Sequence, residues 1–148
     1  MKIDSIRLLL ADDDNDDCLF FEEALEELPI SVQLTTVNDG EQLMQHLEEE
    51  ADTLPSVLFL DLNMPRKNGF ECLVQIKSDE RLKALPVIIY STSFDPETID
   101  LLYDHGAQHF IRKPSEFKQL KQVIHNALIL IAKSITKQPD KEKFVLQP

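Results

Sequence analysis

Two acidic segments of the sequence each follow a short apolar run. Asp12 and Asp13 come directly after the run at 6–11, and Asp61 follows the run at 57–60. If both runs are neighbouring parallel strands, these carboxylates converge at one edge of the sheet, where like charges raise one another's pKa or require a counter-ion. Mg²⁺ suits such a place because it takes oxygen ligands and keeps several waters. The two segments together therefore predict a magnesium site.

Each acidic segment has a simpler interpretation when it is taken alone. The acids at 12–14 are typical of a helix start, where they face the positive end of the helix dipole. Asp61 alone is typical of a turn after a strand. Capping does not explain acids at the ends of two neighbouring strands, so only the two segments in combination favour a shared site.

Two further polar residues follow apolar runs of strand length. Ser91 follows the run at 87–90, and Lys113 follows the run at 110–112. On the same rim as the carboxylates, a hydroxyl and an ammonium group would bind the oxygens of a phosphoryl group, since proteins promote phosphoryl transfer by positioning and charge neutralisation. Without Asp61, Ser91 would be an ordinary loop hydroxyl and Lys113 an ordinary surface charge.

The apolar runs alternate with segments of helical periodicity, which predicts five βα units. Parallel strands need crossover helices, so this order predicts an α/β fold: a doubly wound, five-stranded parallel sheet with five helices. The strand order expected for it is the flavodoxin-like one, 2-1-3-4-5. In that order the first and third strands are neighbours at the switch point where ligands bind. The strands are expected at 6–11, 32–37, 57–60, 86–90 and 109–112.

Capping and turn residues predict where the helices begin and end. Asn38 with Glu41 resembles a capping pair for the second helix. Asp95 followed by Pro96 is typical of the start of the fourth helix. Gly106 is expected to end that helix, because glycine adopts the left-handed conformation of a helix cap without strain.

The length of 148 residues fits a single domain with a sizeable core. The pattern predicts this domain over residues 1–133. In the tail at 134–148 the periodicity dissolves into Lys, Gln, Pro and Asp, so the tail is expected to be flexible. Its short apolar run at 144–146 is the part that is able to dock on a surface.

The net charge of −12 argues against direct nucleic-acid binding, which needs a basic surface. No apolar run approaches the roughly 20 residues that span a bilayer, and the amino terminus does not resemble an export signal. A cytoplasmic protein without membrane contact is therefore expected. Cys18 and Cys72 are too few for a disulfide framework and are expected to be buried thiols.

The sequence resembles the response-regulator receiver family, whose fold is that of the chemotaxis response regulator. The resemblance covers about residues 5–132, and it is specific because four segments occur in the right order on the expected strands. The loop at 64–69 and the stretch at 15–17 are similar to single-domain receivers that are paired with bacterial phytochrome-like histidine kinases. The four segments are 8–14, 58–69, 86–91 and 110–114.

The resemblance implies that Asp61 is the phosphoacceptor, which takes a phosphoryl group from the phosphohistidine of a sensor histidine kinase or phosphotransfer protein. It implies that Mg²⁺ is bound by Asp13, Asp61 and the backbone carbonyl of Asn63, with Asp12 acting largely through water. A protein of this family signals by changing its protein contacts. The resemblance therefore implies that this chain is not an enzyme, apart from dephosphorylating itself.

The resemblance also implies a conformational switch. In it the Ser91 hydroxyl moves to the phosphoryl group, the ring of Phe110 turns inward, and Lys113 contacts the phosphoryl group. The Lys113–Pro114 peptide bond is implied to be cis. Ser91 stands where threonine is commoner, and Thr92 is bulkier than the frequent alanine, so the lifetime of the phosphorylated state stays open.

Two other functions compete with that of a receiver. A phosphatase with an aspartyl nucleophile would need a second acid two residues after Asp61, where Asn63 stands. A scaffold that is never phosphorylated disagrees with the complete set of site residues.

A homodimer is a further hypothesis, because the family usually assembles through the fourth helix, fifth strand and fifth helix. Apolar residues on the fourth helix extend beyond one stripe, which indicates either an exposed patch or ordinary core packing. These residues are Ile99, Leu101, Leu102 and Tyr103.

Overall fold

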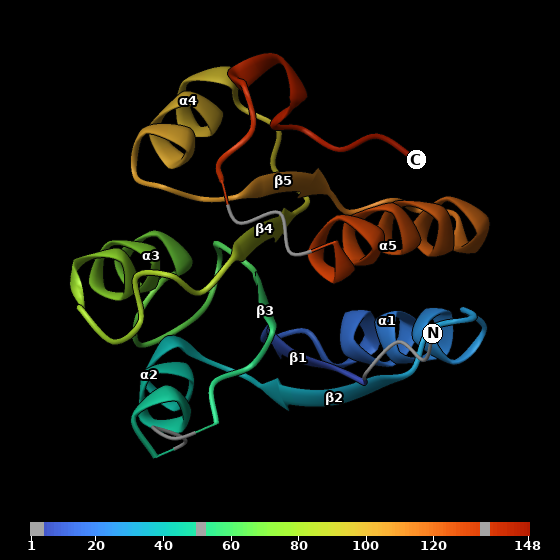
Figure 1. The fold of residues 1–148 in the computed structure, drawn as a ribbon, viewed down its shortest axis with the longest axis horizontal. Helices are drawn as coiled ribbons and strands as arrows, with labels where there is room; N and C mark the ends of the chain where they lie inside the picture. The colour runs from blue at the N-terminus through green and yellow to red at the C-terminus, as the bar shows by residue number, and fades with distance from the viewer. Residues whose placement is uncertain (1–4, 50–52, 134–136) are drawn as a thin grey trace.

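A computed structural model describes residues 5–49, 53–133 and 137–148 of the chain. Strands and helices alternate along it (Figure 1). The strands are β1 (Ile6–Ala11), β2 (Val32–Val37), β3 (Val57–Leu60), β4 (Val87–Ser91) and β5 (His109–Arg112). The helices are α1 (Asn15–Glu26), α2 (Gly40–Glu49), α3 (Gly69–Ser78), α4 (Pro96–Asp104) and α5 (Phe117–Ala132), followed by a 3₁₀ helix at Lys141–Lys143.

The five strands are parallel and lie in the order β2-β1-β3-β4-β5, which confirms the predicted fold class. β1 lies between β2 and β3, and its last residue, Ala11, is opposite Leu60, the last residue of β3. Asp12 and Asp61 therefore leave the sheet at the same edge. No helix among the described residues is long and apolar enough to cross a membrane.

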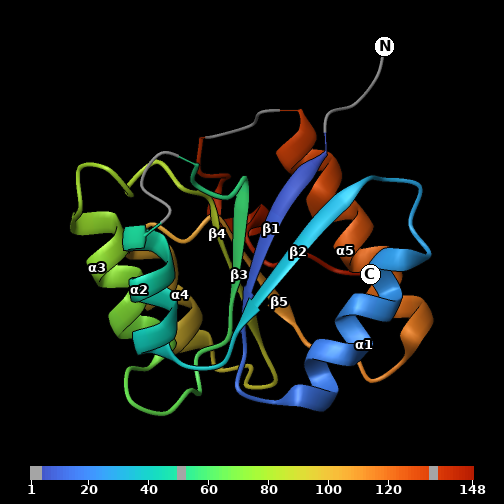
Figure 2. The same cartoon turned by 90° about the horizontal axis from the view of Figure 1, so that it is seen from below.

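Helices cover both faces of the sheet, with α1 and α5 on one face and α2, α3 and α4 on the other (Figure 2). Successive side chains of a strand point to opposite faces, so β1 divides its residues between two cores. Leu8 and Leu10 pack in the core under α1 and α5, while Leu9 and Ala11 pack in the other. Because both faces are covered, the strands are nearly continuous apolar runs, as the sequence shows.

The helix start predicted at Asn38 and Glu41 is wrong by one residue. Because α2 begins at Gly40, Asp39 is the residue that caps it, and its Oδ1 accepts a hydrogen bond from the Gln42 N–H (2.8 Å). Gln42 Oε1 in turn accepts from the Asn38 N–H (2.9 Å). The chain uses the residue directly before the helix as its cap, where the side chain reaches the free N–H groups of the first turn.

Both predicted ends of α4 are confirmed. Asp95 accepts a hydrogen bond from the Glu97 N–H, and Pro96 occupies the first turn. Gly106 has a φ of 93°, and its N–H donates to the Tyr103 carbonyl (3.0 Å). These contacts satisfy backbone groups that a helix leaves without partners at its ends.

Ordinary core packing accounts for most of the apolar residues on α4. Ile99 and Leu102 are buried, and Tyr103 is half-buried, with its ring 5.2 Å from the ring of Phe144. Leu101 is the one of the four that stays largely exposed, at 45%. A broad exposed patch is therefore not present on this helix.

Residues 137–148, here called the C-terminal segment, pack beside α4 and β5 (Figure 1). The Phe110 N–H donates to the Phe144 carbonyl (3.1 Å), and the Leu146 N–H donates to the Phe110 carbonyl (2.9 Å). Phe144 is fully buried. Where a flexible tail was predicted, this segment is packed, and its apolar run at 144–146, the part expected to be able to dock, covers the free edge of β5. Residues 134–136 lie outside the described residues.

Candidate functional site

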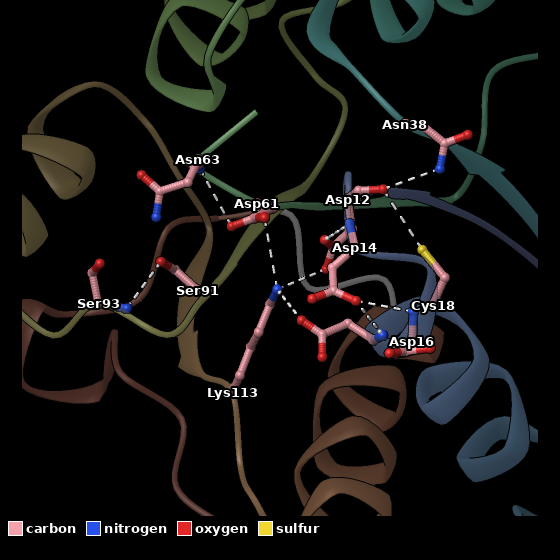
Figure 3. Close-up of polar contacts among 11 residues, drawn as sticks. Asp12, Asp14, Asp16, Cys18, Asn38, Asp61, Asn63, Ser91, Ser93 and Lys113 are labelled. Atoms are coloured by element: carbon pink, nitrogen blue, oxygen red, sulfur yellow. Dashed lines mark hydrogen bonds and ion pairs between the residues drawn. The ribbon is translucent and has the colours of Figure 1, made fainter. Parts of the chain in front are cut away.

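Asp12, Asp13 and Asp61 lie together at the rim where β1 and β3 end. Each offers a carboxylate oxygen, and these oxygens lie within 4.8 Å of one another. Asp12 is fully buried, Asp61 is 4% exposed and Asp13 is exposed. Figure 3 shows Asp61 and Asp12 on either side of the Lys113 ammonium. Oxygen donors at this spacing fit one hard divalent cation, because the carboxylates repel one another without it.

Burial raises the pKa of Asp61 from 3.8 to about 6. The Lys113 ammonium opposes this shift, and the neighbouring Asp12 carboxylate adds to it. Near neutral pH the Asp61 carboxylate is therefore charged in surroundings that disfavour the charge. Binding of a cation would relieve this cost.

Lys113 lies directly after β5 and is the cation of this cluster (Figure 3). Its Nζ donates to Oδ2 of Asp12 and to Oδ2 of Asp17, both at 2.8 Å, and lies 3.6 Å from Oδ2 of Asp61. Burial by itself would lower the pKa of Lys113, but the hydrogen bonds to Asp12 and Asp17 outweigh it and raise this pKa. The ammonium group thus stays charged in the pocket.

Close backbone packing positions the loop that carries Asp61. The Asp61 N–H donates to the Ala11 carbonyl (2.9 Å), and the Gly69 N–H donates to the Leu62 carbonyl (3.0 Å). A Cβ atom on Gly69 would lie 2.2 Å from the Asp61 carbonyl oxygen, so glycine is required here. The Asn63 N–H lies 3.4 Å from Oδ1 of Asp61 and donates to it, which orients the carboxylate (Figure 3).

The start of α1 holds the other side of the site. Asp14 caps this helix, because its Oδ1 accepts from the N–H groups of Asp16 and Asp17. The Asp14 N–H donates to Oδ1 of Asp12 (3.0 Å), and Asn38 Nδ2 donates to the Asp12 carbonyl (3.3 Å). Within this acidic run Asp14 is thus a helix cap, while Asp12 belongs to the carboxylate cluster.

Ser91 and Phe110 lie on the adjacent strands β4 and β5. The Ser91 side chain is buried, and its Oγ accepts from the Ser93 N–H at 3.2 Å (Figure 3). The Ser91 carbonyl accepts from the Lys113 N–H (2.8 Å), which ties the two ends of these strands together. The Phe110 ring is buried, with its centroid 6.1 Å from that of Phe94.

The Lys113–Pro114 peptide bond is trans, so the implied cis bond is wrong for this structure. The trans isomer is the more stable one for most bonds before proline, by about 0.5–1 kcal/mol. With the trans bond, Lys113 Nζ already reaches the carboxylates of Asp12 and Asp61.

The sequence patterns do not single out Asp17, although it shares Lys113 with Asp12. Its one sequence signal is its position in the first turn after the acidic run, since that turn must face the same rim. Its contact with Lys113 joins residues 96 positions apart, which periodicity and motif spacing do not reveal.

The fold and the site together define a class of α/β protein. It has a doubly wound parallel sheet, with carboxylates at the ends of β1 and β3 and a lysine at the end of β5. Its members bind ligands at the switch point of the sheet, here with groups for a cation and an oxyanion side by side. Residues 8–125 match the family model of the response regulator receiver domain, so the chain belongs to this family. It is a receiver domain of two-component signalling, and the comparisons do not support the phosphatase alternative.

Individual relatives agree with this family. The chain is 31% identical over 124 residues to the probable methanogenesis regulatory protein FilR2 of Methanothrix harundinacea, covering 82% of this chain and 80% of that protein. Among solved structures it is similar to the phosphorylated cyanobacterial phytochrome response regulator RcpA (TM-score 0.80, 32% identity, 88% of this chain and 96% of that one). It is also similar to the Mn²⁺-bound form of the response regulator Rcp1 (TM-score 0.78, 26% identity, 90% and 99%).

Proposed function

We propose that this receiver accepts a phosphoryl group on Asp61 from the phosphohistidine of a sensor histidine kinase or phosphotransfer protein. The observation that carries the proposal is the setting of Asp61: a carboxylate only 4% exposed, close to two other acids and 3.6 Å from a buried lysine. Such a carboxylate is a nucleophile with charge-neutralising groups placed around it. Signalling then follows from changed protein contacts, in the cytoplasm, without catalytic turnover of an external substrate.

Mg²⁺ is the cofactor that we propose for the site. The fit rests on the donor set, since three carboxylate oxygens within 4.8 Å are hard ligands suited to this ion. Asp13 and Asp61 would hold it together with the backbone carbonyl of Asn63, and Asp12 would act largely through water. When bound, Mg²⁺ neutralises charge on the carboxylates and on the incoming phosphoryl oxygens. The relative Rcp1 has an Mn²⁺-bound form, which supports a divalent cation as the cofactor of this receiver.

In the transfer step, a carboxylate oxygen of Asp61 attacks the phosphorus of the donor. The new P–O bond forms while the P–N bond to the donor imidazole breaks, and the imidazole keeps the electron pair and takes up a proton. Lys113 neutralises the phosphoryl oxygens at Asp61, and the Ser91 hydroxyl donates a hydrogen bond to another of them. Phe110 then responds to the movement of Ser91 from the adjacent strand.

The absence of a second acid argues against sustained turnover. Asn63 stands two residues after Asp61 and offers an amide where an aspartyl phosphatase would use a carboxylic acid. The phosphorylated state is therefore a signal with a lifetime, ended by slow self-dephosphorylation.

A phytochrome-like histidine kinase is the partner class that the relatives favour. RcpA is described as a cyanobacterial phytochrome response regulator, and a bacteriophytochrome response regulator, RtBRR, matches 93% of this chain at 29% identity with a TM-score of 0.71. A homodimer through α4, β5 and α5 stays a prediction. Because the C-terminal segment lies on α4 and β5, a second copy would have to contact this segment as well; sedimentation with and without phosphorylation tests it.

Intact-mass measurement with Mg²⁺ and acetyl phosphate tests the phosphoacceptor. We expect a gain of one phosphoryl group in the wild type and none in Asp61→Asn. The matched control is Asp104→Asn, which removes the same charge from an exposed residue at the far end of α4 and should be labelled normally. Undiminished labelling of Asp61→Asn would falsify the assignment.

A further inference from the structure

Lys113 lies off-centre among three carboxylates. Its Nζ is 2.8 Å from Asp12 and 2.8 Å from Asp17, but 3.6 Å from Asp61. The first two are charge-assisted hydrogen bonds, while the third is longer than the distance at which such bonds form. The lysine is therefore held on the side of Asp12 and Asp17, away from the carboxylate that would accept the phosphoryl group.

Asp17 is placed for this contact by the start of α1. Its N–H donates to Oδ1 of Asp14, the cap residue, which fixes the backbone of this turn. The N–H of the adjacent Asp16 donates to the same oxygen of Asp14. The Asp16 side chain, however, is exposed and has no ion pair with Lys113. Two neighbouring acids with the same formal charge thus differ in whether they contact the lysine.

The two carboxylates that hold Lys113 differ in exposure. The Asp12 side chain is 0% exposed, whereas the Asp17 side chain is 36% exposed. Losing the lysine would leave Asp12 as an unpaired buried charge, which is strongly unfavourable. Asp17 can be rehydrated when the pair opens, so the loss of the lysine costs less at Asp17 than at the buried Asp12. The bond to Asp17 is therefore the one that can open when Lys113 moves.

We propose that Asp17 is a positioning residue for Lys113: it holds the ammonium away from Asp61 in the unphosphorylated protein and competes for it once Asp61 is phosphorylated. The inference rests on the proposed function of Asp61. A phosphoryl group adds negative charge near Lys113, so the ammonium must leave Asp17 to neutralise it. Asp17 thereby favours the unphosphorylated state.

Loss of the Asp17 carboxylate has two opposite consequences. It removes a competitor for Lys113 and a charge that repels anionic donors, so phosphorylation becomes faster and the phosphorylated state more persistent. It also lets Lys113 move toward Asp61 and removes nearby negative charge, so a divalent cation binds more weakly. General damage to the site would instead weaken both phosphorylation and the binding of the divalent cation.

The test compares Asp17→Asn with Asp16→Asn and Asp17→Glu in the full-length protein. Calorimetric titration with Mg²⁺ should give a Kd about two- to fivefold higher for Asp17→Asn, as expected for loss of one partly exposed charge. The rate of labelling by acetyl phosphate at saturating Mg²⁺ and the half-life of the label should rise by similar factors. Asp16→Asn should change each value by less than about twofold, and Asp17→Glu should restore wild-type behaviour.

The ¹⁵N chemical shift of Lys113 Nζ in the metal-free protein gives a readout that does not depend on phosphorylation. It should change in Asp17→Asn and stay unchanged in Asp16→Asn. If Asp17→Asn matches Asp16→Asn in this shift and in the Kd for Mg²⁺, Asp17 does not position the lysine and the inference is overturned. Failure of the wild type to be labelled would instead refute the proposed function, whatever the shift shows.

Discussion

The acidic rim and the face covered by the C-terminal segment differ in the interactions that hold them together. At the rim, Asp12, Asp17 and Asp61 share the one ammonium group of Lys113, and Asp13 adds a further carboxylate beside Asp12 and Asp61. Negative charge therefore exceeds positive charge there. On the covered face, a fully buried Phe144 packs against Tyr103, and backbone groups pair across the edge of β5. Substitutions that change charge should therefore have their main effect at the rim. Substitutions that change side-chain volume or remove hydrogen bonds should have theirs on the covered face.

The two regions meet at Phe110. Its backbone N–H and carbonyl are both bonded to the C-terminal segment, while its strand continues to Lys113 at the rim. A packed contact on one side of β5 and a crowded charge cluster at its end can therefore influence one another. Substitutions that disturb one region without the other show how far the two are coupled.

Phe144→Ala should have the largest effect on stability. Truncating a fully buried phenylalanine costs about 3–5 kcal/mol of unfolding free energy, because it removes apolar contacts and leaves a cavity. Urea unfolding measures it. Phe94→Ala is the matched control, because Phe94 is 45% exposed, and its cost should be much smaller. Equal costs would show that the C-terminal segment contributes no packing.

Gly69→Ala should disturb the rim through sterics alone. The new Cβ would lie 2.2 Å from the Asp61 carbonyl oxygen, so the loop must shift, at a cost of about 3 kcal/mol. Labelling by acetyl phosphate should also slow, since Asp61 moves. Val74→Ala, at a partly exposed position on the same helix, serves as the control. Unchanged unfolding and labelling would contradict the close approach.

Asp61→Asn should stabilise the metal-free protein at pH 7.5, by roughly 3 kcal/mol. The pKa of Asp61 is about 6 in the folded protein and 3.8 ordinarily, so the folded state binds the proton more tightly. The contribution of Asp61 to folding stability therefore falls as pH rises from 3.8 to 6, and the cost of its charge is fully present above pH 6. The gain should vanish at pH 3.5. Unfolding free energies across this range check it, and a gain independent of pH would refute the electrostatic cause.

Gln138→Ala should have the smallest effect of these substitutions. Its Nε2 donates to the carbonyls of Tyr103 and Ala107, at 2.8 and 2.7 Å, so the change loses about 1 kcal/mol. Lys141→Ala, which breaks only an exposed ion pair with Asp100, should leave the unfolding free energy unchanged. If the lysine substitution proves the more costly of the two, charge rather than hydrogen bonding anchors this segment.

Local patterns were sufficient for most of the fold. The apolar runs predict the strands, and Asp95 with Pro96 and Gly106 predicts both ends of α4, because each signal depends on neighbouring residues. The α2 cap was predicted one residue too early, at Asn38, since Asn38 and Asp39 are both good caps and only the position of the first turn chooses between them.

By itself, the sequence determined that the sheet is parallel and which residues end its strands, because βα units alternate and the ends of parallel strands share one rim. From this, Asp12, Asp13, Asp61, Ser91 and Lys113 were expected at one edge. The flavodoxin-like strand order was expected among the few topologies allowed, and the structure confirms it. Only the tertiary structure decided that Asp17 holds Lys113 and that the C-terminal segment docks beside Phe110. Both depend on contacts between residues far apart in the chain, whose energies arise from burial and geometry that no local pattern encodes.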